Sequence, residues 1–160
     1  MAMAKQQKAH ASPDEVPKLD DFLCFAIYSA NLAMGRIYKP VLDELGLTYP
    51  QYIVLVSLYE EDDQTVGGLG DKLFLDSSTL TPLLKRMEAT GLLTRQRDPE
   101  DERQVRVRLT PQGRSVREQA TAFRGDLVKA IGLSATDFQH LRGQLVKLRT
   151  NLSNALDAEP

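Results

Sequence analysis

The sequence contains one cysteine, Cys24, and two histidines, His10 and His140, among 160 residues. A single cysteine excludes an intramolecular disulfide and agrees with a reducing compartment. The three side chains are isolated from one another along the chain, so they lack the spacing of a Cys/His metal site. We therefore expect neither a metal nor a cofactor.

A long apolar run is also missing. No segment approaches the length needed to cross a bilayer, and residues 1–17 lack the apolar stretch of a signal peptide. We expect a cytoplasmic protein with no membrane contact and a disordered arm over residues 1–17. The apolar content of 42% and the charged content of 26% are ordinary for one globular domain of this length.

Residues 76–91 predict a short amphipathic helix. Asp76 or Ser77 suits the N-cap, and Gly91 suits the stop. The apolar positions have the i, i+3, i+4, i+7 spacing of a buried helix face; they are Leu80, Leu83, Leu84 and Met87. The opposite face offers hydrogen-bond donors, from Ser77, Ser78, Thr79, Thr81, Lys85 and Arg86.

A β-hairpin is predicted directly after this helix. Residues 92–97 and 104–109 can pair, because apolar and basic residues alternate in the second segment, and the charged residues 98–103 suit a turn. A donor-bearing helix followed by a basic hairpin is the winged helix-turn-helix arrangement. In that arrangement the helix lies in the major groove of DNA and a wing-tip arginine reaches the backbone or the minor groove.

The alternative interpretation is that the helix face is merely solvated and the arginine-rich strand is an ordinary edge strand. The location of the charges distinguishes the two interpretations. Residues 85–117 hold nine lysines and arginines against five acids, a net charge of +4, whereas the whole chain has −2. A basic block in a mildly acidic chain is expected where a protein contacts phosphates. Nucleic-acid binding is the favoured interpretation.

The remaining segments are mainly helical. We expect a helix from Leu19 towards Gly46 that kinks or breaks near Tyr38 because of Pro40. Further helices are expected from Thr48 to about residue 60, over 65–74, from 110 to about 131, and from 134 to 156. The acidic residues 60–63 are expected to be a solvated loop.

The fold class is therefore mainly α with a small β-hairpin wing. Residues 48–110 are expected to form the winged helix-turn-helix region. The wide apolar stripe of the first helix, and the leucine seam of the last, predict a helical dimerisation region over 18–47 and 111–157. Intramolecular packing is the alternative. A dimer is favoured because such modules usually read two half-sites about 34–36 Å apart, which implies a pseudo-palindromic operator in double-stranded DNA.

The segments DSSTLTPLLKRMEATGLLTR and DPEDERQVRVRLTPQG resemble the DNA-binding core of the MarR family of transcriptional regulators. The wording LDS-x-TLTPLLKRME is most similar to the organic hydroperoxide regulators (OhrR type), and the resemblance extends from about Leu19 to about Leu156. Ser78 departs from it, because glycine is expected there. Since no second cysteine is present, the chain resembles the one-cysteine form of that subgroup.

The resemblance implies a homodimeric repressor rather than an enzyme. It implies that Cys24 is a peroxide-sensing thiol which Tyr38 and Tyr49 of the other subunit approach, and Tyr28 shares its helix face at i+4. Phenol donors favour a thiolate, which peroxide oxidises to sulfenic acid. The sulfenic acid then condenses with a low-molecular-weight thiol or overoxidises, and the apolar surroundings favour an organic hydroperoxide.

The DNA contacts follow from the helix and the wing. The four hydroxyl residues of 77–81 are expected at base edges or phosphates, with Lys85 and Arg86 nearer the backbone. Arg103 is expected to enter the minor groove, Arg97 and Arg106 to support strands or phosphates, and Asp101 to orient an arginine. Two alternatives are a MarR-type regulator released by a phenolic or anionic ligand, and a thiol peroxidase.

Overall fold

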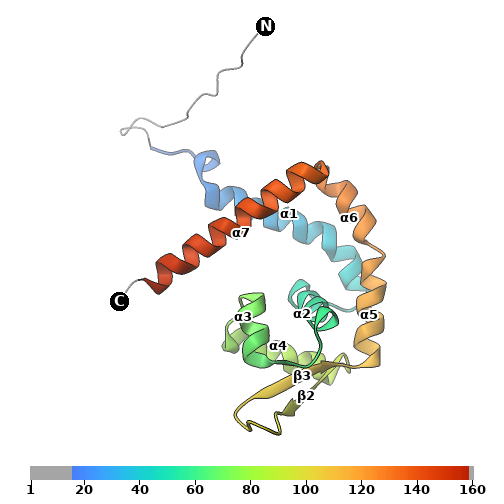
Figure 1. Cartoon of the computed structure of the whole chain (residues 1–160). Coiled ribbons are helices and arrows are strands. Elements are labelled where there is room, and N and C mark those ends of the chain that lie inside the picture. The colour runs from blue at the N-terminus through green and yellow to red at the C-terminus, as the bar shows by residue number, and fades with distance from the viewer. Residues whose placement is uncertain (1–15, 159–160) are drawn as a thin grey trace.

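The computed structural model describes residues 16–158, so most of the expected N-terminal arm lies outside the described residues. The elements occur in one order along the chain (Figure 1). They are η1 (Leu19–Asp21), α1 (Leu23–Glu44), α2 (Tyr49–Glu60), β1 (Gln64–Thr65), α3 (Val66–Leu73), α4 (Ser77–Ala89), β2 (Leu93–Arg97), β3 (Val105–Leu109), α5 (Pro111–Thr121), α6 (Arg124–Ile131) and α7 (Ala135–Asp157).

The hydrophobic core lies where α2, α3 and α4 meet the sheet. The apolar face predicted for α4 is buried there, because Leu80, Leu84 and Met87 have no exposed surface. The end of α1 also contributes. The buried cluster consists of Leu42, Leu47, Val54, Leu55, Leu58, Leu69, Leu80, Leu83, Leu84, Met87, Leu92, Leu93, Val107 and Leu109.

The hairpin forms as predicted and carries a third strand. β2 and β3 are antiparallel, with Leu93 opposite Leu109 and Arg97 opposite Val105. The two-residue β1 pairs with the other edge of β3, so the strand order is β1-β3-β2. The sequence did not predict β1, because two residues carry no alternation pattern. This strand ties the start of α3 to the wing.

Local signals set most helix boundaries. Thr48 and Gln51 form a capping box at the start of α2, and Thr65, Asp76, Thr110 and Ser134 cap the starts of α3, α4, α5 and α7. Gly91 follows α4 with a φ of 76°, which glycine adopts readily. α3 and α4, with the turn between them, form the helix-turn-helix.

Two helices differ from expectation: α1 does not break at Pro40, and the helix expected from 110 to about 131 is interrupted. α1 continues through Pro40 to Glu44. Proline removes one backbone hydrogen bond in the second-last turn, and the packing of Leu42, 4% exposed, holds the rest of the helix in place. The helix expected from 110 to 131 is divided at Ala122 and Phe123, where the Ala122 N–H donates to the Gln119 carbonyl and the Phe123 ring packs against Tyr38.

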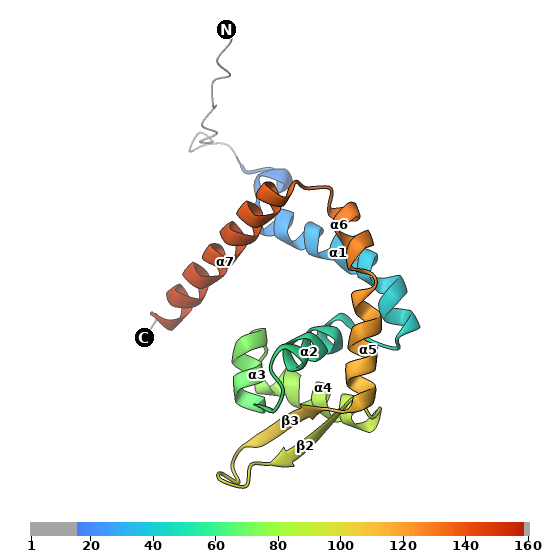
Figure 2. The ribbon, with the colours of Figure 1, turned by 45° about the vertical axis from the view of Figure 1, so that its right-hand side comes forward.

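Most of α1 and all of α7 lie outside this core; of these two helices, only the end of α1 contributes to it. α5 leads from the wing to α6, which contacts α1, and α7 then turns back along the molecule (Figures 1 and 2). None of the side chains of α7 is buried. Across residues 16–158, every helix is too short or too polar to span a membrane.

Candidate functional site

The exposed face of α4 begins with a hydrogen-bonded cap. Asp76 accepts from the Thr79 N–H at 2.9 Å and from the Ser78 hydroxyl at 2.5 Å. These hydrogen bonds, of which the one from Ser78 has the largest effect, hold the pKa of Asp76 below its usual value. Ser77, Ser78 and Thr79 are exposed, and Thr81 is half-buried. The structure therefore presents the predicted donors together at the N-terminal end of α4, with the Ser78 and Thr79 hydroxyls both engaged by the Asp76 carboxylate.

Two cations follow on α4. Lys85 and Arg86 are exposed, and neither forms an ion pair within residues 16–158. The next charged residue, Glu88, instead binds Arg95 of β2: the Arg95 Nε and backbone N lie 3.0 and 2.9 Å from its carboxylate oxygens. This pair fixes the wing to the helix and leaves Lys85 and Arg86 available to a ligand.

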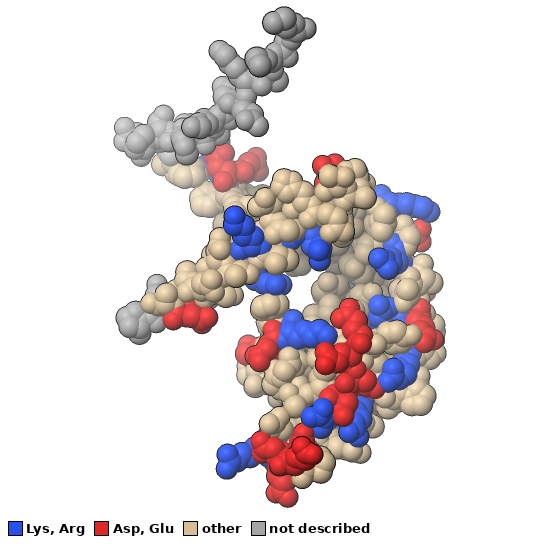
Figure 3. All heavy atoms as spheres, viewed as in Figure 1, with Lys and Arg blue, Asp and Glu red and all other residues tan. Residues whose placement is uncertain are grey.

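The wing turn is ordered by its acids. Asp101 accepts from the Arg103 backbone N–H at 3.1 Å and from the Gln104 amide at 3.0 Å. The carboxylate thus orders the turn that carries Arg103, rather than pairing with a guanidinium. Arg97 and Arg103 are exposed and form no ion pair among the described residues. Acidic and basic side chains are interspersed over this winged part of the molecule (Figure 3).

The expectation of a solvated acidic loop was wrong for its last two residues. Asp63 binds Arg106, with Nε to Oδ1 at 2.8 Å, and Asp98 binds the same guanidinium at 3.0 Å. Asp62 accepts from the Leu109 backbone N–H at 2.9 Å and forms an ion pair with Arg114. Arg106 therefore supports the wing from within. Sequence reasoning missed these partners because they lie more than forty residues apart.

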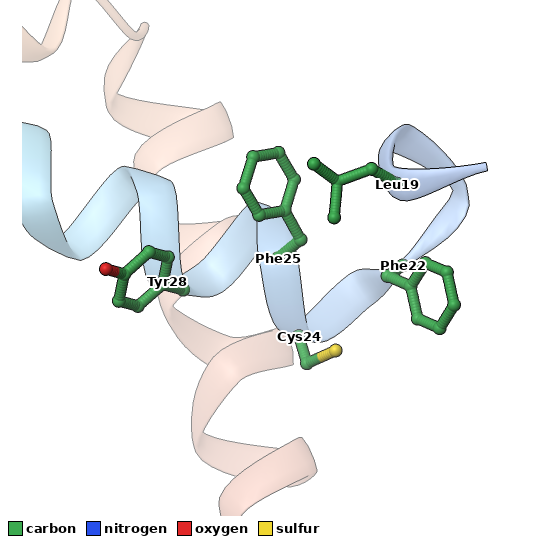
Figure 4. Close-up of a pocket in the computed structure, with 5 residues that line it drawn as sticks. All are labelled: Leu19, Phe22, Cys24, Phe25 and Tyr28. Carbon is green, nitrogen blue, oxygen red and sulfur yellow. The ribbon is translucent and has the colours of Figure 1, made fainter.

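Cys24 lies in the first turns of α1 and is exposed. A pocket of about 390 Å³ contains it, lined otherwise by Leu19, Phe22, Phe25 and Tyr28. Figure 4 shows the sulfur at the edge of this apolar lining, with the Tyr28 hydroxyl directed away from it. Tyr28 therefore contributes its ring to the pocket rather than a donor to the sulfur. The surroundings suit an apolar molecule that reaches the thiol from outside.

Tyr38 and Tyr49 lie in a different place. Tyr38 contacts the rings of Tyr49, Tyr52 and Phe123, at centroid distances of 5.1, 5.8 and 6.1 Å. Burial, and then the neighbouring phenols of Tyr49 and Tyr52, raise the pKa of Tyr38 to about 12. Tyr38 follows Cys24 by fourteen residues of α1, or about 21 Å along the helix. One chain does not bring them together.

The sequence of this chain is similar to those of known transcriptional regulators. A family model for the transcriptional regulator SarA/Rot matches residues 36–119. The organic hydroperoxide resistance transcriptional regulator of Bacillus subtilis is 44% identical over 135 residues, which cover 84% of this chain and 92% of that protein. The chain belongs to the MarR family of transcriptional regulators, in the organic hydroperoxide regulator subgroup.

Solved MarR-family structures agree with the fold. Reduced AbfR bound to DNA is 33% identical, with a TM-score of 0.70 over 84% of this chain and 94% of AbfR. A mutant of MarR from E. coli, complexed with operator DNA, is 29% identical, with a TM-score of 0.73 over 79% of this chain and 92% of MarR. The chain is therefore a winged-helix regulator of the DNA-binding type, and not an enzyme such as a thiol peroxidase.

Proposed function

We propose that this MarR-family protein is a homodimeric repressor which binds a pseudo-palindromic operator and releases it when an organic hydroperoxide oxidises Cys24. The observation that carries the proposal is the Cys24 sulfur at the edge of an open apolar hollow. A buried inert cysteine would be closed to a reactant. The setting proposed for this chemistry is the cytoplasm, where a thiol stays reduced.

The DNA-binding surface in this proposal combines α4 with the wing tip. Ser77, Thr79 and Thr81 contact base edges or phosphates in the major groove. Ser78 joins them, and both Ser78 and Thr79 turn their hydroxyls away from Asp76 to do so. Phosphates bind Lys85 and Arg86, and Arg97 contacts the backbone beside the wing. Arg103 enters the minor groove from a turn ordered by Asp101.

The second chain covers the helices at the chain ends, in residues 18–47 and 111–157. Large apolar side chains are exposed there, and a monomer rarely leaves so many uncovered. On α1 and α7 they include Leu23, Ile27, Leu32, Ile37, Phe138, Leu141, Leu145, Val146 and Leu152. Pairing of these faces fixes the spacing of two winged domains, residues 48–110 of each chain, on one operator.

Dimerisation also supplies the donors that Cys24 lacks in its own chain. Tyr38 and Tyr49 of the partner subunit approach the sulfur and stabilise its thiolate. The thiolate attacks one peroxide oxygen, the O–O bond breaks, and the departing alkoxide takes a proton from water, which leaves a Cys24 sulfenic acid and an alcohol. A low-molecular-weight thiol then condenses with the sulfenic acid, with loss of water. The added bulk separates packed helices and changes the spacing of the two winged domains.

A second candidate function is release by a non-covalent phenolic or anionic ligand. A pocket of about 480 Å³ lies beside α1 and contains both Tyr38 and Tyr49 with the cations Arg36 and Lys39. Aromatic rings and cations together suit an aromatic acid.

Trapping the oxidised thiol tests the leading proposal. The reduced protein, bound to a duplex selected from random sequences, is treated with cumene hydroperoxide while fluorescence anisotropy reports DNA release. Samples taken with time are reacted with dimedone, which labels sulfenic acid, and are analysed by mass spectrometry. Label on Cys24 that rises with release supports the proposal; release that precedes any change at Cys24 favours the ligand-binding candidate.

A further inference from the structure

Asp63 stands at the centre of the charges that join the helix-turn-helix to the wing. It has a φ of 59°, a left-handed conformation that aspartate and asparagine adopt more readily than most residues. Its carboxylate lies 2.8 Å from the Nε of both Arg106 and Arg108, and the Arg108 Nη2 donates to its second oxygen at 3.0 Å. This two-oxygen contact with Arg108 is the geometry in which arginine also binds a phosphate.

The two arginines depend on Asp63 to different degrees. Arg106 also donates to Asp98 at 3.0 Å and to the Asp63 carbonyl oxygen at 2.5 Å. Arg108 forms its ion pair with Asp63 alone among the described residues, and its side chain is 49% exposed. Loss of the Asp63 charge therefore releases Arg108 while Arg106 stays bound.

The loop does not depend on that charge for its position. Asp62 accepts from the Leu109 backbone N–H and pairs with Arg114, and the Gln64 amide donates to the Glu61 carbonyl at 2.6 Å. β1 continues this attachment by pairing Gln64 with Val107. An uncharged residue of the same shape at position 63 is accordingly expected to keep the wing in place.

We infer that Asp63 is a specificity-determining positioning residue: it occupies Arg108 as a phosphate would and so withholds this cation from DNA. The inference rests on the proposed DNA-binding function. A free arginine on the strand that carries the wing would bind the phosphates of any sequence, which raises non-specific affinity and adds to the salt dependence. With Arg108 paired to Asp63, the cations available to DNA are those of α4 and the wing tip. These side chains reach the DNA only when α4 is aligned with the bases, so the binding that they provide depends on the DNA sequence.

The experiment compares Asp63→Asn with the full-length wild-type protein on two duplexes, one selected from random sequences and one with its bases shuffled. For the shuffled duplex, Asp63→Asn should bind about tenfold more tightly. Its plot of log affinity against log salt should be steeper by about 2 for a dimer, since each subunit gains about one phosphate contact. The preference for the selected duplex should fall by a similar factor.

Two further variants separate this role from other effects. Glu61→Gln removes the same charge from an exposed neighbour that has no ion pair among the described residues, and should behave as wild type. Asp63→Asn/Arg108→Gln removes the released cation and should restore the wild-type slope and preference. Weaker binding of Asp63→Asn to both duplexes, with an unchanged or shallower salt slope, would show a purely structural role and overturn the inference. Failure of the wild-type protein to prefer any duplex would instead count against the proposed function.

Discussion

The ring of Tyr38 meets the ring of Tyr49 edge to face, with centroids 5.1 Å apart and an angle of 62° between the planes. The contact joins α1 to the first residue of α2, and burial there raises the pKa of Tyr38 to about 12. The hydroxyl is a hydrogen-bond donor while it is protonated, and the raised pKa extends the protonated form to a higher pH.

The first prediction is an alkaline loss of stability that depends on Tyr38. Because the folded state favours the neutral phenol, its contribution is complete below pH 10 and is lost as the pH rises from 10 through 12. Urea unfolding measured at intervals across this range should show a smaller loss for Tyr38→Phe than for wild type. Tyr28→Phe, the same change at a side chain 59% exposed, is the control and should keep the wild-type profile. Equal losses in all three proteins would contradict the prediction.

The second prediction concerns the contact between α5 and Leu92, which lies between α4 and β2. A Cβ added at Gly113 would lie 2.0 Å from the Leu92 carbonyl oxygen, so backbone must move to admit it. Gly113→Ala should lower the free energy of unfolding by about 1–3 kcal/mol or more, as overpacking does.

The matched control for that change is Gly125→Ala in α6. A Cβ at Gly125 meets nothing within 4 Å, and alanine favours the helix by about 0.5–1 kcal/mol over glycine. Thermal unfolding should therefore shift in opposite directions for the two variants. A Gly113→Ala protein as stable as wild type would mean that α5 does not pack this closely on Leu92.

The third prediction assigns the wing tip to DNA. Arg103→Ala should weaken binding to a selected duplex and make the salt slope shallower by about 2 for a dimer. Lys129→Ala removes the same charge from α6, at a side chain 82% exposed, and should leave both quantities unchanged. An Arg103→Ala protein with wild-type affinity and slope would refute the winged mode of binding.

The fourth prediction tests the proposed dimer. Leu141 and Leu145 of α7 are 50% and 43% exposed, and carboxylates at both positions would be desolvated in a helical interface. Leu141→Glu/Leu145→Glu should elute as a monomer in size-exclusion chromatography with light scattering, and should lose operator binding. Gln144→Glu adds a charge to the same helix and should remain dimeric; an unchanged mass for the double variant would place the interface elsewhere.

Local sequence patterns were sufficient to predict α4 and the wing. Asp76, the apolar spacing from Leu80 to Met87, and Gly91 set α4 within the predicted range, because capping and amphipathic packing act over a few neighbouring residues. The pairing of β2 with β3 followed from the alternation of apolar and basic residues in the second strand and from the charged turn before it; the register, with Leu93 opposite Leu109, came from the structure. The resemblance to the MarR family, carried by the same segments, was confirmed by the comparisons.

What local patterns missed depends on partners distant in sequence. Asp63 looked solvated because its partners Arg106 and Arg108 come more than forty residues later. Pro40 was expected to interrupt the helix, but Leu42 packs against core residues that are distant in sequence and so holds the last turn of α1 in place. The approach of Tyr38 and Tyr49 to Cys24 stays a prediction, since it requires a second chain.

The most direct test of the central claim is the affinity of wild-type and Cys24→Ser proteins for a selected duplex, each with and without cumene hydroperoxide and a low-molecular-weight thiol. Serine keeps the size of the side chain and removes the oxidisable sulfur. Both reduced proteins should bind equally; oxidant should release the wild-type protein and leave Cys24→Ser on the DNA. Release of Cys24→Ser by the hydroperoxide would contradict the claim and place the sensor elsewhere in the molecule.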